Sequence, residues 1–343
     1  MKSGPGARRA LLIRGATTIA VVGVLCWLPQ QYGPTETTLY AEALFIAVAA
    51  MGLNLLTGYN GQVSIGHGAF FGLGAYATGI LMLDHGWPFL ATLPVAAVLA
   101  AVVGAAVGFP ALRVKGLYLA LITLGLAALF PALVNKFVKS TGGTSLVQLY
   151  RVRPKPPEWA SSFAAAEDQW RYYVTLVVAG VLFALMVNLV RGRFGRALVA
   201  VREHEAAAET LGINLARVKV SAFAISALYA GVAGSLAALV RLQANAGQIE
   251  VFQQSIIFLV AVVIGGTATT LGPVVGAFVV VLLQDHTADL IKDEPTLSPA
   301  LFGITLILLM YVLPDGLVGG CRRLFRRIRG RMHAGSATDS APT

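Results

Sequence analysis

The amino-acid sequence predicts an all-α fold, a polytopic bundle of transmembrane helices, and three observations support this prediction. Hydrophobic residues make up 57% of the 343-residue chain and charged residues 12%, whereas about a quarter of the residues in a soluble domain are charged. Apolar runs of about twenty residues recur from end to end, and a helix of that length crosses a bilayer. The Lys and Arg residues behind the net charge of +10 concentrate in short loops and in both tails, which indicates membrane topology rather than a nucleic-acid-binding patch.

The apolar runs divide residues 1–320 into about ten membrane segments, some of them short and broken, of one integral membrane domain. The first run could instead be a cleaved signal peptide, but Leu25 stands where a lipoprotein cleavage site needs a small residue. We therefore expect it to be retained as a helix. The segments are expected at 11–29, 39–57, 63–83, 89–112, 117–138, 172–190, 218–240, 253–266, 270–286 and 298–314.

Loop charge predicts the orientation, because Lys and Arg favour the cytoplasmic side of a membrane. The basic N-terminus and the arginine cluster at 322–331 place both termini in the cytoplasm. One long helix over 255–285 would put that cluster outside, so we expect two short segments broken at "GGTATTLGP" instead. Residues 140–171 are expected to form a periplasmic loop despite their own Arg and Lys, and residues 321–343 a disordered basic tail in the cytoplasm.

Two glycine-rich interruptions are the most unusual local feature of these apolar runs. "TGYNGQVSIGHGAFFGLGAYATG", residues 57–79, contains seven glycines among polar side chains, and "GGTATTLGP" interrupts the chain again near its other end. Transporters build their pathways from Gly- or Pro-interrupted segments in corresponding places of two halves. Close helix packing is the alternative use of such glycines. The residues expected to line a translocation pathway are Asn54, Asn60, Gln62, Ser64, Gly66, His67, Gly265, Gly266, Thr267, Gly272 and Pro273.

The chain shows no motif for catalysis or for a cofactor. His67 has no other His, Cys, Asp or Glu in its segment, so a packing histidine is a better interpretation than a metal ligand. The sequence contains no Walker loop, H-E-x-x-H or G-x-S-x-G pattern. We therefore expect no metal, no cofactor and no catalytic residue in this chain, and no binding to nucleic acid.

Residues 196–211 have the pattern of a short amphipathic helix between two membrane segments. Leu198, Val201, Ala208 and Leu211 fall on one stripe of that helix. Gly212 then supplies a C-terminal stop, and Asn214 can cap the membrane helix that follows. Such a helix can bind anionic lipid headgroups through its arginines, or its small alanines at 206–208 can fit the groove of a partner protein.

Three blocks of sequence resemble one known family. They are "GLNLLTGYNGQVSIGHGAFFGLGAYA" from Gly52, "GRFGRALVAVREHEAAAETLGINLARVKVSAFAISA" over 192–227, and "VVIGGTATTLGPVVGAF" from Val262. Together they resemble the membrane permeases of branched-chain amino acid ATP-binding-cassette importers, of the LivM-like type. The resemblance implies a multi-pass protein of the bacterial inner membrane that catalyses no reaction. It also implies as partners a second related permease, two cytosolic ATPase subunits and a periplasmic solute-binding protein.

The resemblance also implies roles for particular residues. The family's cytoplasmic coupling motif, which docks into an ATPase subunit, falls on the region 192–217. Two departures from the family are visible: Ala268 stands where a glycine is usual, and the outer loop keeps only its opening "TGG" at 141–143. The residues implied in ATPase coupling are Arg202, Glu205, Ala206, Ala207, Glu209 and Gly212.

Several alternatives remain open from the sequence. Relatives of similar appearance carry branched-chain amino acids, urea, amides or aromatic acids, and the sequence does not separate these cargos. Broken helices also suit a free-standing secondary transporter or channel. Against that alternative, no carboxylate lies in the middle of any apolar segment, where proton coupling would need one. An intramembrane enzyme would need a partner for His67 from another helix.

Overall fold

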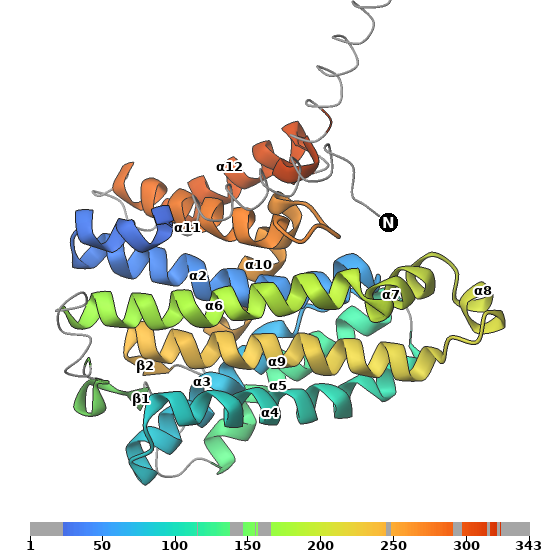
Figure 1. The fold of residues 1–343 in the computed structure, drawn as a ribbon, viewed down its shortest axis with the longest axis horizontal. Helices are drawn as coiled ribbons and strands as arrows, with labels where there is room; N and C mark the ends of the chain where they lie inside the picture. The colour runs from blue at the N-terminus through green and yellow to red at the C-terminus, as the bar shows by residue number, and fades with distance from the viewer. Residues whose placement is uncertain are drawn as a thin grey trace, which may run out of the picture.

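The computed structural model describes most of the chain as packed helices (Figure 1). Most of the first predicted segment, most of the predicted periplasmic loop and nearly all of the basic tail lie outside the described residues. The described residues are 23–114, 116–137, 147–154, 156, 166–244, 248–290, 297–313, 316–320 and 323.

Seven of the described helices are long and apolar enough to cross a membrane. The chain is therefore a multi-pass helical membrane protein, because a helix satisfies its own backbone hydrogen bonds within lipid. These helices are α2 (Pro34–Asn54) with its π-helical extension η1 (Leu55–Tyr59), α4 (Phe89–Gly108), α5 (Leu117–Phe137), α6 (Glu167–Arg191), α9 (Leu215–Arg241), α11 (Gly272–Leu290) and α12 (Ser298–Val312), whose candidate span is Ala300–Gly320.

Two further predicted segments correspond to helices outside this group of seven. The run predicted at 63–83 corresponds to α3 (His67–His85), and the run at 253–266 to α10 (Gln248–Gly265). The chain between η1 and α3 is not helical, and a tight turn separates α10 from α11. Both glycine-rich stretches thus interrupt helices, as their composition predicts.

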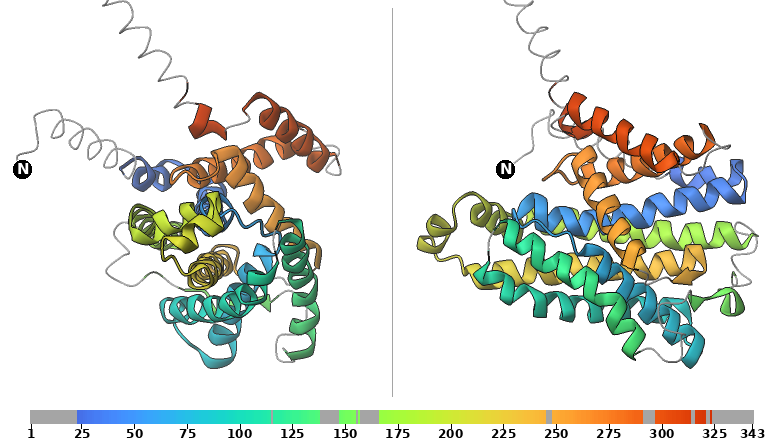
Figure 2. Two further views of the ribbon diagram at one scale, coloured as in Figure 1. Left: turned by 90° about the vertical axis from the view of Figure 1, so that its right-hand side faces the viewer. Right: turned by 180° about the vertical axis from the view of Figure 1, so that it is seen from behind.

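Helices α2 and α9 form the centre of the bundle. In each of them 83% of the most apolar window is buried, whereas in α12 the value is only 6%. Seen end-on, α9 and α2 are surrounded by α4, α5, α6, α11 and α12 (Figure 2). The outer helices therefore turn much of their apolar surface away from the protein, as contact with lipid requires.

Small and hydroxylated residues let α3 approach α9 closely. A Cβ added at Gly74 would clash with the carbonyl oxygen of Gly231, and one added at Gly234 would clash with the carbonyl oxygen of Phe71. Side-chain hydroxyls join the same helices, as in the 2.5 Å contact between Thr78 Oγ1 and Ser235 Oγ. Close backbone approach and interhelical hydrogen bonds stabilise helix pairs where lipid supplies no hydrophobic driving force.

The two ends of the bundle differ (Figure 1). At one end, which we call the α8 end, α6 leads through α7 (Arg193–Glu203) and α8 (Glu205–Thr210) into α9. At the opposite end, the β1 end, strand β1 (Val147–Gln148) pairs antiparallel with β2 (Gln243–Ala244), which follows α9. A short 3₁₀ helix (Tyr150–Val152) follows β1.

The single helix predicted over 196–211 is in fact two helices. His204 adopts an extended conformation, with φ of −151° and ψ of 102°, and α8 begins directly after it. Leu198 and Val201 of α7 and Ala208 of α8 are buried, as the predicted stripe requires, whereas Leu211, directly after the end of α8, is 80% exposed. The two predicted caps are confirmed: Gly212 has a left-handed φ of 82°, and Asn214 Oδ1 accepts a 2.9 Å hydrogen bond from the backbone N–H of Arg217.

Candidate translocation and coupling sites

The first glycine-rich break begins where η1 ends and lasts until α3 begins at His67. Within it Asn60 Nδ2 donates to Gln62 Oε1 at 2.5 Å, and the backbone N–H of Ile65 donates to Thr123 Oγ1 of α5 at 3.1 Å. Gly66 packs directly against the backbone of Thr123 and has no room for a side chain. The break is therefore an ordered segment in which every second residue from Asn60 to Gly66 is buried against the bundle, whereas Gly61 and Val63 are exposed.

Helix α3 starts halfway along the bundle. His67 lies beside Gly52 of α2, and Gly52 in turn packs against Ser226, which is near the middle of α9. Ser226 Oγ donates to the carbonyl oxygen of Gly52 at 2.8 Å. The predicted pathway residues of the first break thus lie between the α8 end and the middle of the bundle.

Buried polar atoms accumulate in this first break. Asn60 Oδ1, Ser64 Oγ and both ring nitrogens of His67 have no hydrogen-bond partner within the described ranges. The His67 ring is fully buried between the rings of Phe70 and Phe258, with centroids 6.2 and 6.3 Å away. Orphaned buried polar groups are rare in proteins and mark places where a water or a ligand binds.

The second glycine-rich break connects α10 to α11 at the α8 end. Asn54, the last residue of α2, forms hydrogen bonds to this connection. Asn54 Nδ2 donates to the carbonyl oxygen of Thr269 at 2.8 Å, while its Oδ1 accepts from the backbone N–H of Ala268 at 2.9 Å. Within the turn, Thr269 Oγ1 accepts from the backbone N–H of Gly272 at 3.0 Å. The structure therefore brings together two segments that lie more than 200 residues apart in sequence.

The other predicted pathway residues of the second break shape the turn itself. Gly266 has a φ of 107°, which favours glycine, and the backbones of Gly265 and Gly272 pack too closely for a Cβ on either. Pro273 is buried in the first turn of α11, and Thr267 is exposed beside it. These residues set the shape of a tight connection at the α8 end, whereas Asn60, Gln62 and Ser64 lie in the interior segment.

Arg202 of α7 joins the predicted coupling region to the first break. Its Nη1 donates to the carbonyl oxygen of Gly58 at 2.5 Å, and its side chain lies against Gly61, which has a left-handed φ of 73°. Gly58, in η1 just before the first break, also packs against Asn54 Oδ1 and the Ala268 backbone, so these contacts connect α7, η1 and the α10–α11 turn in series. The sequence singled out Arg202 and Asn54 but did not show that they contact the same short segment.

Helix α8 is held to α9 by an ion pair. Glu205 Oε1 accepts from Lys219 Nζ at 2.8 Å, and the Lys219 side chain is only 6% exposed. The remaining predicted coupling residues, Ala206, Ala207, Glu209 and Gly212, are exposed on the α8 end. Glu209 and Gly212 line a polar recess with Glu205, Asn214 and Lys219. This surface is available to a partner that approaches the α8 end.

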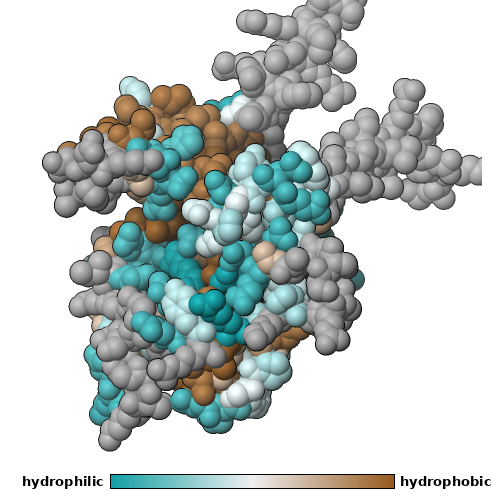
Figure 3. Space-filling model, turned by 90° about the vertical axis from the view of Figure 1, so that its left-hand side faces the viewer, coloured by the Kyte–Doolittle hydropathy of each residue, from teal (hydrophilic) through white to brown (hydrophobic). Residues whose placement is uncertain are grey.

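The β1 end carries a polar pocket that the sequence analysis missed. Polar side chains gather at the centre of this end, between more apolar margins (Figure 3). Arg241, the last residue of α9, pairs through Nε with Glu42 Oε1 of α2 at 2.7 Å, and its Nη1 lies 3.9 Å from Glu250 Oε1 of α10. Each charge lies near the end of an apolar run, where it has the pattern of an ordinary flanking charge. Sequence alone therefore gave no signal that the three side chains meet.

Comparison with known proteins then identifies the family. Residues 37–310 match the family model described as the permease component of the branched-chain amino acid transport system. The chain belongs to this permease family. Members are translocation subunits of ATP-binding-cassette transport systems and have no catalytic role of their own.

Curated relatives of the permease include two proteins named as high-affinity branched-chain amino acid transport system permease protein LivM. The LivM protein of Escherichia coli strain K12 is 32% identical over 79% of this chain and 67% of its own length. The LivM protein of Salmonella typhimurium is 31% identical over 92% of this chain and 76% of its own length. The LivH permease of E. coli is 26% identical over 80% of this chain. No solved structure matches the permease.

Proposed function

We propose that the permease forms part of the pathway through which an ATP-driven importer carries branched-chain amino acids or similar small solutes into a bacterial cell. The family and the printed names of the LivM relatives support this cargo. The observation that carries the proposal is the serial contact from α7 through Arg202, Gly58 and Asn54 to the α10–α11 turn. Movement of α7 is then transmitted to both glycine-rich breaks.

The proposed assembly contains two cytosolic ATPase subunits, a second related permease and a periplasmic solute-binding protein, within the inner membrane. Similarity to both LivM and LivH relatives supports the pairing of two related permeases. In this assembly residues 1–320 form the integral membrane domain, with 192–217 as the coupling region and 140–171 on the periplasmic side. Both termini and the tail at 321–343 then lie in the cytoplasm.

The coupling region suits this role because the connections between its helices are very short. A single residue, Gly192, separates α6 from α7, and His204 alone separates α7 from α8. The Glu205–Lys219 pair fixes α8 to the start of α9. A force applied to α8 by an ATPase subunit therefore moves α6 and α9 together, in the manner of a rigid lever.

Variants of the coupling region test this role. Glu205→Ala removes the partner of a largely buried ammonium group, and Gly212→Val forces a β-branched residue into a left-handed turn. We expect either change to lower ATP-driven leucine uptake several-fold while the chain still inserts in the membrane and copurifies with its sister permease. Gly180→Ala, at an open position of α6 outside the coupling region, is the control, and it should leave uptake unchanged. Wild-type uptake by both variants would contradict the coupling assignment.

A free-standing secondary transporter or channel is the second candidate, because buried unpartnered polar atoms in a broken helix suit either mechanism. The two candidates differ in what the permease does by itself. The purified chain, reconstituted in liposomes without ATPase subunits, is expected to show no leucine flux under a proton or sodium gradient. Gradient-driven flux from the chain alone would favour the second candidate.

A further inference from the structure

The first glycine-rich break leaves a non-helical residue exposed at membrane depth. Val63 is 38% exposed, and neither its backbone N–H nor its C=O forms a hydrogen bond within the described part of the chain. His67, which lies beside Gly52 at the level of the middle of α9, follows four residues later. Four residues span at most about 14 Å, and half of the hydrocarbon core is about 15 Å thick. Val63 therefore lies within the depth of that core.

Neither lipid nor water suits this exposed surface. Lipid-exposed irregular backbone does not occur in the hydrocarbon region, because lipid offers no hydrogen-bond partner. Helix α5 adjoins the break through the bond from the Ile65 N–H to Thr123 Oγ1. On either side of Thr123 in the sequence, Leu121 and Ile122 of α5 are 53% and 41% exposed, so the surroundings are apolar and do not line a water-filled channel. A second protein satisfies both conditions.

Small residues line the outward face of α5. Gly125 has no atom within 4 Å of the place where a Cβ would lie. Ala128 and Ala132 follow at intervals of three and four residues, and both are exposed. Small residues at helical spacing let a helix of another chain approach closely within a membrane. The outward face of α5 therefore suits contact with protein.

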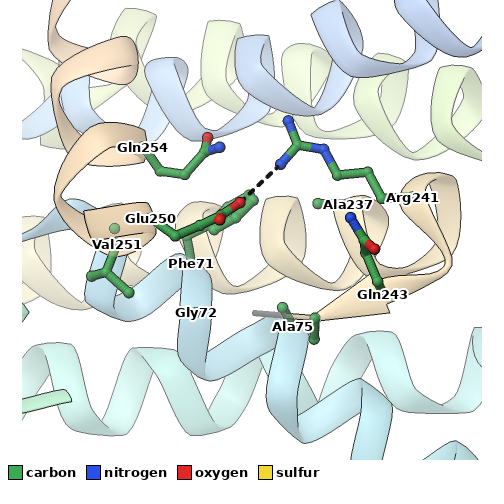
Figure 4. A pocket seen from close by; sticks show the side chains of 11 residues that line it. Phe71, Gly72, Ala75, Ala237, Arg241, Gln243, Glu250, Val251 and Gln254 are labelled. Carbon is green, nitrogen blue, oxygen red and sulfur yellow. Dashed lines mark ion pairs between the residues drawn. The ribbon is translucent and has the colours of Figure 1, made fainter. Parts of the chain in front are cut away.

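Helix α10 continues this face beside α5. Figure 4 shows Glu250 and Gln254 on the side of α10 that is directed at Arg241 of α9. Phe252 and Ile256 lie on the opposite side of the helix and are 43% and 41% exposed. Seen from behind, α5 and α10 lie next to each other at the front of the bundle, in green and orange (Figure 2). We call Val63 together with the outward sides of α5 and α10 the α5–α10 face.

The α5–α10 face is large enough for a stable interface. Helix α5 has 21 residues and α10 has 18. At 1.5 Å per residue these helices are about 32 and about 27 Å long, and with a width of about 10 Å each they present roughly 600 Å². Two partners together then bury roughly 1,200 Å², which exceeds the about 1,000 Å² that a specific interface needs.

We propose that the α5–α10 face binds the second, related permease of the importer, a proposal that rests on the function proposed above. The partner packs apolar side chains on Gly125 and Ala128 and supplies hydrogen-bonding groups to the Val63 backbone. The described N-terminal residues lie elsewhere, against α6, where Tyr172 Oη donates to the carbonyl oxygen of Leu25 at 2.8 Å. The first glycine-rich break then lies at the boundary between two permeases.

Photocrosslinking in membranes that contain the whole importer tests the face. The photoreactive residue p-benzoylphenylalanine is placed at Leu121 of α5 or, as the matched control, at Val102 of α4, which is 61% exposed. We expect ultraviolet light to join the chain to the sister permease from Leu121 but not from Val102. As much adduct from Val102 as from Leu121, or none from Leu121, would overturn the proposal. An adduct of Leu121 with a second copy of this chain, in place of the sister, would overturn it too.

A bulky side chain on α5 tests the packing. Ala128→Trp places an indole where the partner approaches, and we expect at least a fivefold loss of the sister permease that copurifies with the tagged chain. Ala106→Trp, at an exposed alanine of α4, is the matched control and should retain the sister as the wild type does. Both variants should reach the membrane in wild-type amounts, and the crosslinking result at Leu121 decides if Ala128→Trp does not accumulate. Equal retention by the two variants contradicts the assignment.

The wild type separates this inference from the function on which it rests. A wild-type chain that retains no related permease when all subunits are coexpressed would overturn the proposed assembly. A wild type that retains its sister, while Ala128→Trp retains it equally well, would overturn only the assignment of the α5–α10 face.

Discussion

At the scale of single residues, Ala268 holds a backbone conformation that L-amino acids rarely adopt. Its φ of 55° lies in the left-handed region, and its N–H donates to Asn54 Oδ1, so the turn cannot relax without losing that bond. The left-handed conformation costs an L-residue roughly 1–2 kcal/mol relative to glycine. The family resemblance had shown only that a glycine is usual here; the dihedral angle supplies the physical reason.

We therefore predict that Ala268→Gly stabilises the permease by about 1 kcal/mol. The midpoint of chemical unfolding of the purified protein in detergent measures the effect. Ala184→Gly, on the exposed face of α6, is the control, and it should lower stability by about 1 kcal/mol because glycine is unfavourable inside a helix. A lower unfolding midpoint for Ala268→Gly than for the wild type would show that the turn is not strained.

Arg202 is the residue through which α7 contacts the first break, and its replacement should uncouple transport from hydrolysis. Arg202→Gln removes the hydrogen bond to the Gly58 carbonyl and most of the contact with Gly61, a loss of roughly 1 kcal/mol in α7 docking. We expect leucine uptake per ATP hydrolysed to fall several-fold. Arg196→Gln changes an exposed arginine of the same helix that donates to the Arg191 carbonyl, and it should leave this ratio unchanged. Equal ratios for the two variants would rule out Arg202 as the link.

At the scale of helices, the approach of α3 to α9 depends on glycines whose neighbours leave no space. A Cβ at Gly234 would meet the Phe71 carbonyl, whereas a Cβ at Gly180 of α6 would meet nothing within 4 Å. We predict that Gly234→Ala destabilises the permease by about 1–3 kcal/mol and that Gly180→Ala is neutral or stabilising by up to about 1 kcal/mol. Thermal unfolding of the two variants in the same detergent makes the comparison. If both alanines behave alike, the close packing is not a determinant of stability.

The sequence predicted helices better than it predicted their contacts. Apolar runs, Gly212 and Asn214 are local signals, and they located α9 and its start correctly. The bend at His204 has no local signal in the sequence, and the next residue, Glu205, pairs with Lys219, which is fourteen residues away. The Asn54 contacts and the Arg241 cluster join residues about 200 positions apart, and a single sequence carries no record of such neighbours.

At the scale of the whole molecule, the proposal requires the α8 end to face the cytoplasm. In a variant whose two native cysteines, Cys26 and Cys321, are replaced by serine, a cysteine at exposed Leu211 reports on one end and a cysteine at exposed Tyr150 on the other. A membrane-impermeant maleimide added to intact spheroplasts should label Tyr150→Cys only, and it should label Leu211→Cys after permeabilisation. Labelling of Leu211→Cys in intact spheroplasts would place the coupling region outside and end the proposal.

Helix α3 begins only at His67, partway along the bundle, and this has a consequence for how a solute leaves the protein. The chain leading into α3 is the segment from Asn60 to Gly66, in which the buried side-chain oxygens Asn60 Oδ1 and Ser64 Oγ find no protein partner in the described part of the chain. Buried groups of this kind recruit ordered water. We therefore expect the lower half of the permease to be hydrated at rest, so that an amino acid sheds its water once, on entry, and begins to recover it before it reaches the cytosol.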